Sequence, residues 1–435
     1  MPNSVYVATR VARWVCLERR DQDYFADGMT EELISVVSRI HGLDVIARTS
    51  VMAYRDTTKS ISQIGRELGV GSVLEGSVRK AGDQLRITVQ LIDVATQGHL
   101  WSHDYDREFR AVFQVQSDIA RQVAGALQVA LLGAEERRLE RAPTDNLEAY
   151  DLYLLGRHHV NKRTDAGLRR AIEYFREAAQ FDPMFASAYA GLADAYVLAG
   201  IGYAAIPNAL DQAHAAATRA AELDGDLADA HTSLGYVLLN RDWDWQAAER
   251  EFRQAVEMSP SNAQAYQWFA HVAIYRRQYG KAAKRADRAR ELDPLSVLIQ
   301  NESGWAAHHS GDNDEALARF AKAASMDPSF AMAHFNIGNV YQAKGELEKA
   351  ISCYRRAVDL SGRMPFTVSF LAAALARTGQ RHEARESLDE LLAQEKAGAG
   401  LSVWLAVVHE AMGDKVQSLY RLEQAFEPGS CSRGR

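Results

Sequence analysis

One spacing limits what this chain can fold into more than any other feature: turn signals recur at a step of 34 residues. Each signal is a polar residue followed by proline or glycine, as in Ser259-Pro260, Asp293-Pro294, Asp327-Pro328 and Ser361-Gly362. Proline cannot donate the next backbone hydrogen bond, so such a dipeptide ends a helix. Upstream, Asp182-Pro183 and Asp224-Gly225 continue the series with a longer unit between them. A constant step of this length indicates a repeat architecture.

Small and aromatic residues fall at fixed offsets between the turn signals. Three units place a glycine first, then an alanine, an aromatic residue and a second alanine: Gly235, Ala248, Phe252, Ala255; Gly304, Ala316, Phe320, Ala323; and Gly338, Ala350, Tyr354, Ala357. Small residues let two helices approach closely, and the aromatic ring fills the space between neighbouring pairs. An arbitrary alanine-rich bundle has no reason to keep this register, so we favour stacked helix pairs.

The register and the offsets resemble the tetratricopeptide repeat. The resemblance covers about residues 147–427, as seven full units and a weaker last one, and implies an all-α superhelical solenoid. An insertion interrupts the second unit around 200–208, and a loop is expected at 398–400. We expect the final pair, near 404–426, to cap the stack. A short tail, residues 428–435, would follow.

Residues 22–133 show a different pattern, which predicts an α/β domain. A helix ending near Gly42 is predicted by one apolar stripe, formed by Phe25, Met29, Leu33, Val36, Val37 and Ile40. Ser60 and Gln63 make a capping box for a second helix that runs through Leu68.

Strands are predicted from short apolar or alternating runs in the same domain. The run 43–47 reads as a buried strand, and 73–78 and 85–94 flank a turn at 81–83. A further strand, 99–105, precedes an amphipathic helix that closes the domain.

Four stretches of this domain look very like a bacterial TolB-like domain. They are Tyr-Phe-Ala-Asp-Gly-Met-Thr-Glu-Glu-Leu at 24–33, Val-Ile-Ala-Arg-Thr-Ser at 45–50, Leu-Glu-Gly-Ser-Val-Arg at 74–79 and His-Leu-Trp at 99–101. The resemblance implies a place ahead of tetratricopeptide repeats in multidomain signalling proteins. Members of that family often carry, before this domain, a class III adenylate/guanylate cyclase domain or a winged-helix DNA-binding domain.

The start of the chain departs from the family pattern. Family members begin with an apolar strand, whereas residues 1–21 form an irregular, diverged start in which arginines interrupt the place of that strand. Residues 5–8 are the weak substitute for it. We therefore expect a truncated or re-started version of a longer protein. Between the α/β domain and the repeats, residues 134–146 are expected to form a linker helix rich in arginine and glutamate.

Bulk properties exclude several classes of protein. At 435 residues the chain can form more than one buried unit, and its formal net charge of -7 gives no sign of a nucleic-acid partner. Three widely spaced cysteines, Cys16, Cys353 and Cys431, fit neither a disulfide framework nor a zinc site. With no apolar run of about 18 residues, we expect no membrane span and a soluble, cytoplasmic protein.

Motifs that carry known chemistry are missing from the sequence. It has no phosphate-binding loop, no His-Glu-x-x-His and no Gly-x-Ser-x-Gly. The pairs His158-His159 and His308-His309 do not suit a metal, because adjacent helical residues point about 100° apart. No catalytic residue, metal or cofactor is predicted.

Several charged residues could have a functional role, but a structural role accounts for them better. Four carboxylates could pair for acid–base work: Glu31, Glu32, Asp104 and Asp106. A solvated helix start and a strand end account for them without catalysis. Arg48 and Arg79 could bind an anion, and we favour structural hydrogen bonding for both.

The repeats offer a stronger candidate site, a partner-binding groove on the concave face. The first helix of each pair lines that face, and it carries Asp194, Tyr236, Gln267, His271, Asn301, Trp305, His308, Phe335, Asn339 and Gln342. Amides pair with a peptide backbone, and aromatic rings supply contact area at little entropic cost. The alternative for any single one is an ordinary groove residue without a fixed ligand. We expect the Trp305 indole to point into the groove.

These patterns together favour a non-catalytic signalling or scaffold protein that binds a protein or peptide partner through its solenoid. Two alternatives stay open: the non-catalytic remainder of a class III adenylate/guanylate cyclase, and the effector half of a winged-helix transcription regulator. Neither a cyclase catalytic domain nor a DNA-reading helix fits into residues 1–21. The sequence therefore predicts no cyclase activity and no nucleic-acid binding for this chain.

Overall fold

The computed structural model describes residues 4–7, 23–55, 57–396 and 400–426. The predicted tail at 428–435, most of the loop at 398–400 and most of the irregular start lie outside the described residues. The chain divides into two compact units, Met1–Arg276 with Lys284–Ser296 and Arg277–Ala283 with Val297–Arg435. The first unit therefore contains the α/β domain together with the first repeats.

The α/β domain is built on a five-stranded sheet in the order β2-β1-β3-β4-β5. The strands are β1 (Ser4–Val7), β2 (Asp44–Val45), β3 (Ser72–Ala81), β4 (Gln84–Asp93) and β5 (His99–Glu108). β1 pairs in parallel with both β2 and β3, whereas β3, β4 and β5 form an antiparallel meander. A strand thus forms over Ser4–Val7, within the stretch expected to be irregular, and it overlaps the residues named as the weak substitute for a first strand.

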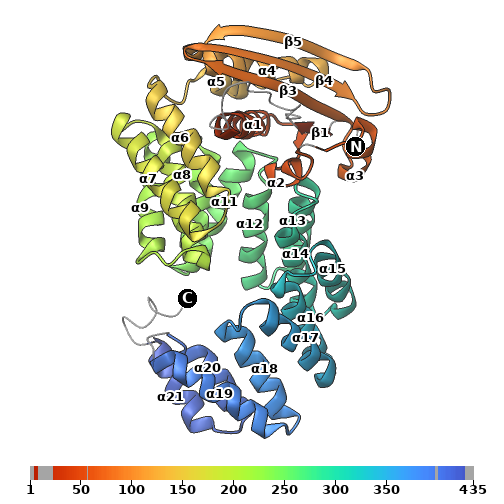
Figure 1. Ribbon diagram of the computed structural model, residues 1–435, viewed down its shortest axis with the longest axis vertical. Helices are drawn as coiled ribbons and strands as arrows, with labels where there is room; N and C mark the ends of the chain where they lie inside the picture. Colours follow the sequence, from red (N-terminus) through yellow and green to blue (C-terminus); the bar gives the residue numbers. More distant parts are fainter. Residues whose placement is uncertain (1–3, 8–22, 56, 397–399, 427–435) are drawn as a thin grey trace. The chain divides into compact units, whose positions relative to one another are not determined.

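In the described part of this domain the α-helices are α1 (Asp23–Val37), α2 (Arg48–Met52), α3 (Ile61–Leu68), α4 (Val112–Ala126) and α5 (Gly133–Glu140). Alternate residues of β4, from Leu85 to Leu91, are buried, as the period-2 pattern predicts. Helices α1, α4 and α5 lie on one side of the sheet (Figure 1). The capping box of Ser60 is present, and the helix it starts ends at Gly69 with a φ of 69°.

The run 43–47 differs from its prediction. Only Asp44 and Val45 pair in the sheet, and α2 begins at Arg48, in a stretch without a helical prediction. The reason lies in the repeats, because the Ala47 backbone N–H donates to the Leu292 carbonyl at 2.8 Å. A backbone group engaged there cannot extend the sheet ladder.

The remaining described residues form helix pairs. They are α6 (Leu147–Val160) and α7 (Asp165–Phe181), α8 (Ala186–Leu198) and α9 (Ala209–Leu223), α10 (Ala228–Asn240) and α11 (Trp245–Met258), α12 (Ala263–Tyr275) and α13 (Tyr279–Leu292), α14 (Val297–Ser310) and α15 (Asn313–Met326), α16 (Ala331–Ala343) and α17 (Leu347–Leu360), α18 (Pro365–Arg377) and α19 (Arg381–Lys396), and α20 (Ser402–Ala411) and α21 (Lys415–Phe426). The insertion at 200–208 begins within a π-helical turn at Ala199–Tyr203.

The close approach predicted within each pair is present. A Cβ placed on Gly304 would lie 2.6 Å from the ring of Phe320, which is fully buried. A Cβ on Gly338 would lie 2.6 Å from the ring of Tyr354 in the same way. Glycine is therefore required where the second helix's aromatic ring packs against the backbone of the first.

The last pair does not have the polar outer face expected of a cap. On α21, Val416, Leu419 and Tyr420 are exposed, Val416 by 77%. A capping repeat presents polar residues outward because nothing stacks on it. The capping role expected for 404–426 therefore stays a prediction.

The glycine contact generates a stability prediction for the second unit. Gly304→Ala should destabilise it by about 1–3 kcal/mol, because the added methyl group overlaps a ring that close packing cannot move freely. Urea unfolding followed by circular dichroism measures the cost.

Gly280→Ala is the matched control, since Gly280 is helical and a Cβ there meets nothing within 4 Å. It should be neutral or stabilising by up to about 1 kcal/mol. Equal effects of the two substitutions would contradict the packing role of Gly304.

Candidate functional site

The second unit carries six of the ten predicted groove residues, on α14 and α16. Trp305, His308, Asn339 and Gln342 are partly buried and present part of their surface to solvent. Asn339 accepts a hydrogen bond from the Tyr354 hydroxyl at 2.8 Å. These four side chains combine an indole, an imidazole and two amides on neighbouring first helices.

Three predicted groove residues are buried, so little of their side chains is available for contact with a partner. Phe335 is in the core of the second unit, with its ring centroid 5.2 Å from Phe366 and 5.0 Å from Phe370. Asn301 is also buried, and its Oδ1 accepts from Asn336 at 3.1 Å. Gln267 of the first unit is likewise buried. The aromatic and amide character that suggested binding serves packing and hydrogen bonding between helices at these positions.

Trp305 is part of the packing as well as of the accessible surface. Its partly buried ring packs against a cluster formed by Ala316, Phe320 and Val340. The indole therefore contributes to the stability of the second unit, which the expectation of a groove-pointing side chain did not include.

The first unit carries Asp194 on α8, Tyr236 on α10 and His271 on α12, all partly buried. The Tyr236 ring lies 4.5 Å from that of Trp268. Burial raises the pKa of Asp194, and the neighbouring Asp229 raises it further, while Arg157 opposes the shift. Arg157 is the link between these repeats and the α/β domain.

The α/β domain docks on α6 through the stretch that resembles the TolB-like motif. Arg157 of α6 donates to Glu31 of α1, and Asn161 donates to the same carboxylate at 2.7 Å. The Tyr153 hydroxyl donates to Glu32 at 3.0 Å. Consecutive carboxylates of α1 are thus held by the first repeat.

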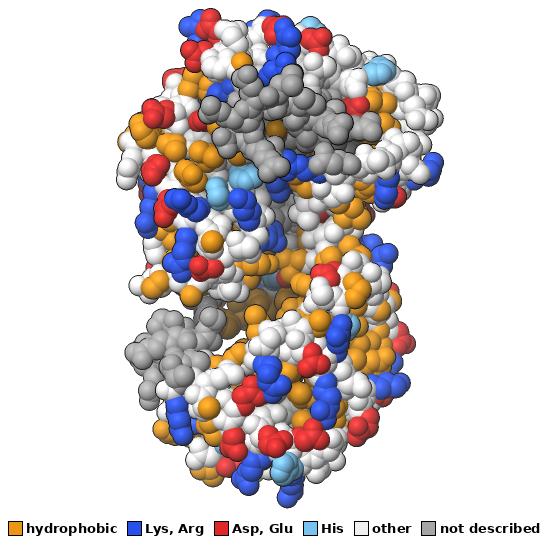
Figure 2. All heavy atoms as spheres, viewed as in Figure 1, with side chains coloured by type: hydrophobic (Ala, Val, Ile, Leu, Met, Phe, Trp, Pro, Cys, Tyr) orange, Lys and Arg blue, Asp and Glu red, His pale blue; other side chains and the backbone are white. Residues whose placement is uncertain are grey.

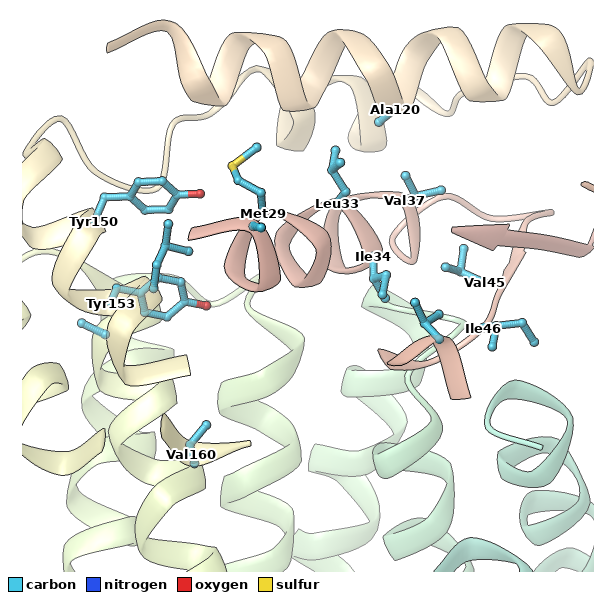
Figure 3. Close-up of a cluster of buried hydrophobic side chains, with 14 of the residues drawn as sticks. Met29, Leu33, Ile34, Val37, Val45, Ile46, Ala120, Tyr150, Tyr153 and Val160 are labelled. Atoms are coloured by element: carbon cyan, nitrogen blue, oxygen red, sulfur yellow. The ribbon is translucent and has the colours of Figure 1, made fainter. Parts of the chain in front are cut away.

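Apolar side chains surround these ionic contacts. Figure 3 shows Met29 and Leu33 pointing from α1 toward α4, with the rings of Tyr150 and Tyr153 of α6 at the same end of α1. The Tyr150 ring lies 4.6 Å from that of Phe113 of α4 and is fully buried. Repeat and α/β domain share one hydrophobic core here.

A second set of contacts uses the turns between repeats. The Ser261 hydroxyl accepts from the Val45 backbone N–H and donates to the Leu43 carbonyl, both at 3.0 Å. Asp293 accepts from the Ser50 backbone N–H at 3.1 Å and from the Ser50 hydroxyl at 2.5 Å. Burial raises the pKa of Asp293 to about 6. Two of the periodic turn signals are therefore docking points for the α/β domain.

In the first unit, α6 and the turns at Ser261 and Asp293 thus contact the α/β domain as well as neighbouring repeats. Arg48 lies 3.5 Å from the Glu31 carboxylate through its Nε, which makes no hydrogen bond among the described residues, so the structural hydrogen bonding expected for it stays a prediction. Arg79 is exposed on β3.

The carboxylates and histidines singled out in the sequence do not converge on a reaction centre. Asp106 pairs with Arg86 on the exposed face of the sheet at 2.7 Å, and Asp104 is exposed. His158 lies 3.4 Å from Asp27, while the His159 ring lies 5.4 Å from that of Tyr174. The described residues contain no group of three or more metal-ligating side chains.

Surface charge in the second unit is mixed in sign. Exposed pairs join successive helices there, for example Arg355 with Glu383 at 2.7 Å and Arg377 with Glu410 at 2.8 Å. Figure 2 shows basic and acidic side chains interspersed over this part of the visible face.

Comparisons with known families confirm the repeats. Models described as tetratricopeptide repeat match residues 331–362 and 269–324, and one described as TPR repeat matches 304–345. The chain is 39% identical over 220 residues to "Putative adenylate cyclase 3" of Rhizobium meliloti (strain 1021), a match that covers 50% of this chain and 38% of that protein.

Other relatives match more distantly. "Transcriptional regulator HilA" of Salmonella typhimurium is 21% identical over 63% of this chain and 49% of its own length. The chain thus spans less than half the length of these curated relatives. Among solved structures, "YrrB: a TPR protein with an unusual peptide-binding site" is 27% identical, covers 43% of this chain and 91% of its own, and has a TM-score of 0.32. A tetratricopeptide repeat protein from Parabacteroides merdae matches over 61% of this chain and 100% of its own, with 14% identity and a TM-score of 0.46.

One further result bears on membranes. Among the described residues, no helix combines the length and the apolar character needed to cross a lipid bilayer.

From this docking contact we expect Arg157→Leu to lower the free energy of unfolding by a large amount. The change removes the guanidinium that hydrogen-bonds to the buried Glu31 carboxylate and leaves only Arg48, whose Nε lies 3.5 Å away. Breaking a buried ion pair typically costs about 3–5 kcal/mol. Arg170→Leu is the control, because Arg170 forms an exposed pair with Glu173 at 2.9 Å and should cost less than about 1 kcal/mol.

Chemical unfolding of both variants measures the difference. The double variant Glu31→Leu/Arg157→Leu should recover part of the loss, because the buried Glu31 charge is removed together with its hydrogen-bonded partner. Equal, small costs for Arg157→Leu and Arg170→Leu would show that the docking contact carries little energy.

We expect the stability of the protein to depend on pH because of the raised pKa of Glu32. Burial raises its pKa from the ordinary 4.5 to about 7, although Arg157 and the Tyr153 hydroxyl oppose the shift. The folded protein therefore binds more protons than the unfolded chain between these values, and its stability falls as the pH rises from about 4.5 to about 7.

Glu32→Gln should remove this dependence. At pH 8 the variant should exceed the wild type by about 3 kcal/mol at most, and at pH 4 the two should agree closely. Urea unfolding at both values tests this. Parallel pH profiles for the two proteins would contradict the assignment to Glu32.

Proposed function

We propose that this protein is a non-catalytic scaffold that binds an extended segment of a protein partner on the first helices of its repeats. The observation that supports it most directly is the set on α14 and α16: Trp305, His308, Asn339 and Gln342, partly buried yet accessible. Asp194, Tyr236 and His271 are the corresponding candidates in the first unit.

The chemistry of this set suits a peptide. Side-chain amides donate to and accept from a peptide backbone, and imidazole can do either according to its tautomer. A partly buried indole is already held in place by packing, so a ligand that contacts it orders little further side-chain motion. Buried Phe335 and Asn301 would support this surface from beneath and not contact the partner.

The proposal also covers the α/β domain, which we propose to be a TolB-like domain. This domain would be a docked companion of the repeats, because its motif stretch is occupied by contacts to α6. The relative named as an adenylate cyclase favours one alternative, a role as the non-catalytic part of such an enzyme. The relative named as a transcriptional regulator favours the effector half of a regulator in the same way.

Peptide binding is tested with Trp305→Ala. Peptides selected against the wild type from a random extended-peptide library should bind this variant with a loss of about 2 kcal/mol or more, as for a central aromatic anchor. Stability should fall by about 1 kcal/mol, because packing against Phe320 is also lost.

Trp243→Ala is the matched control, a tryptophan that is 64% exposed in the first unit. It should leave peptide affinity unchanged. Selected peptides that bind Trp305→Ala as tightly as the wild type would remove this groove from the proposal. Turnover of ATP to cyclic AMP by the purified chain, abolished by a substitution in it, would overturn the non-catalytic part.

A further inference from the structure

A cavity of about 320 Å³ lies in the first unit, where the α/β domain meets the repeats. Its walls come from α1, α4, the α5 segment as far as Pro143, the start of α8 and the turn after α9. Its volume is at the lower end of that of known small-ligand pockets, about 300–1,000 Å³. None of the proposed groove residues lines it.

Arg138 of α5 lines this cavity with an unused donor. Its Nε is buried and makes no hydrogen bond among the described residues. The Asp226 carboxylate oxygen lies 3.7 Å from that nitrogen, beyond hydrogen-bond reach. A buried N–H without an acceptor is costly, so a bound acceptor in the cavity would relieve it.

Arg39 of α1 adds a second cation to the wall. It is partly buried, and its Nη2 reaches the Ser35 hydroxyl at 3.5 Å, which is a weak contact for a guanidinium. The wall carries three carboxylates, Glu32, Asp224 and Asp226. Asp224 pairs with Arg141 at 3.2 Å, Asp226 lies 3.7 Å from Arg138, and Glu32 accepts from Tyr153. Four arginines, Arg39, Arg137, Arg138 and Arg141, line the same wall, so positive charge is in excess by one formal charge.

Apolar side chains form another part of the wall. Val36, Phe113, Leu139 and Leu227 supply hydrophobic surface. Gln116 donates to the Tyr150 hydroxyl at 2.9 Å. A ligand would therefore meet these apolar side chains together with arginine donors as polar recognition groups.

We infer that this cavity binds a small organic anion, with one carboxylate, sulfonate or phosphate group on a compact apolar body. The anionic group pairs with Arg138 and Arg39, and the apolar body lies against Phe113, Leu139 and Leu227. This site is separate from the proposed peptide groove, so the inference does not depend on the proposal that the groove binds a peptide.

Occupancy of the cavity would join three parts of the first unit. Arg39 belongs to the α/β domain, Arg138 to the linker helix α5, and Leu227 to the repeats. A ligand that contacts all three stabilises their docked arrangement by mass action. Its binding would thus strengthen the attachment of the α/β domain to the solenoid.

Two matched fluorescent probes test the inference on the full chain. 8-Anilino-1-naphthalenesulfonate carries the required anion on an apolar body, and N-phenyl-1-naphthylamine has the same rings without the sulfonate. The sulfonate probe should bind one site saturably and more tightly than the neutral probe. Arg138→Gln and Arg39→Gln should each weaken it about tenfold, as expected for loss of a charge-assisted contact, with little effect on the neutral probe.

Arg250→Gln, an exposed arginine of α11, should bind both probes as the wild type does, as should Trp305→Ala. Melting curves identify folded variants, and Arg39→Gln carries the test if Arg138→Gln does not fold. The inference is overturned by the absence of saturable sulfonate binding, by equal affinity for the two probes, or by arginine variants that bind the sulfonate probe like the wild type.

Discussion

The Glu31 carboxylate of α1, held by Arg157 of α6 and by Asn161 just after that helix, is the contact on which the first unit depends. A stack of repeats is stabilised mainly by nearest neighbours, so each pair normally owes little to distant parts of the chain. Here two residues 126 positions apart are joined in a partly buried ion pair. The pair connects the first repeat to a domain of a different fold class, and the two parts also share one hydrophobic core that includes Tyr150.

Much of the architecture was predictable because it depends on local spacing. The 34-residue step, Gly304 with Phe320, and the capping box at Ser60 are all short-range patterns that the structure confirms. Helix α2 and the two-residue length of β2 were not predictable, because Ala47 is engaged by Leu292, far away in the sequence. Tertiary contacts override local propensity at such positions.

The candidate groove shows the same limit at the level of side chains. Position in the repeat placed Trp305 and Asn339 on a partly accessible face, but it did not distinguish them from buried Phe335 and Asn301. Burial there depends on neighbouring helices, such as those that bring Phe366 and Phe370 to Phe335. The cavity lined by Arg39 and Arg138 left no signal in the sequence, because its walls come from segments that are distant along the chain.

The inter-repeat turns at Ser261 and Asp293 carry a consequence for how this chain can evolve. Solenoids commonly gain or lose whole units, because each unit contacts only its neighbours. In this chain the α/β domain binds α6 and also the turns before α12 and after α13. Deleting or duplicating one unit between these points would move the turns away from Leu43 and Ser50. Because the α/β domain must contact both ends of this segment, the number of repeats from α6 to α13 is fixed.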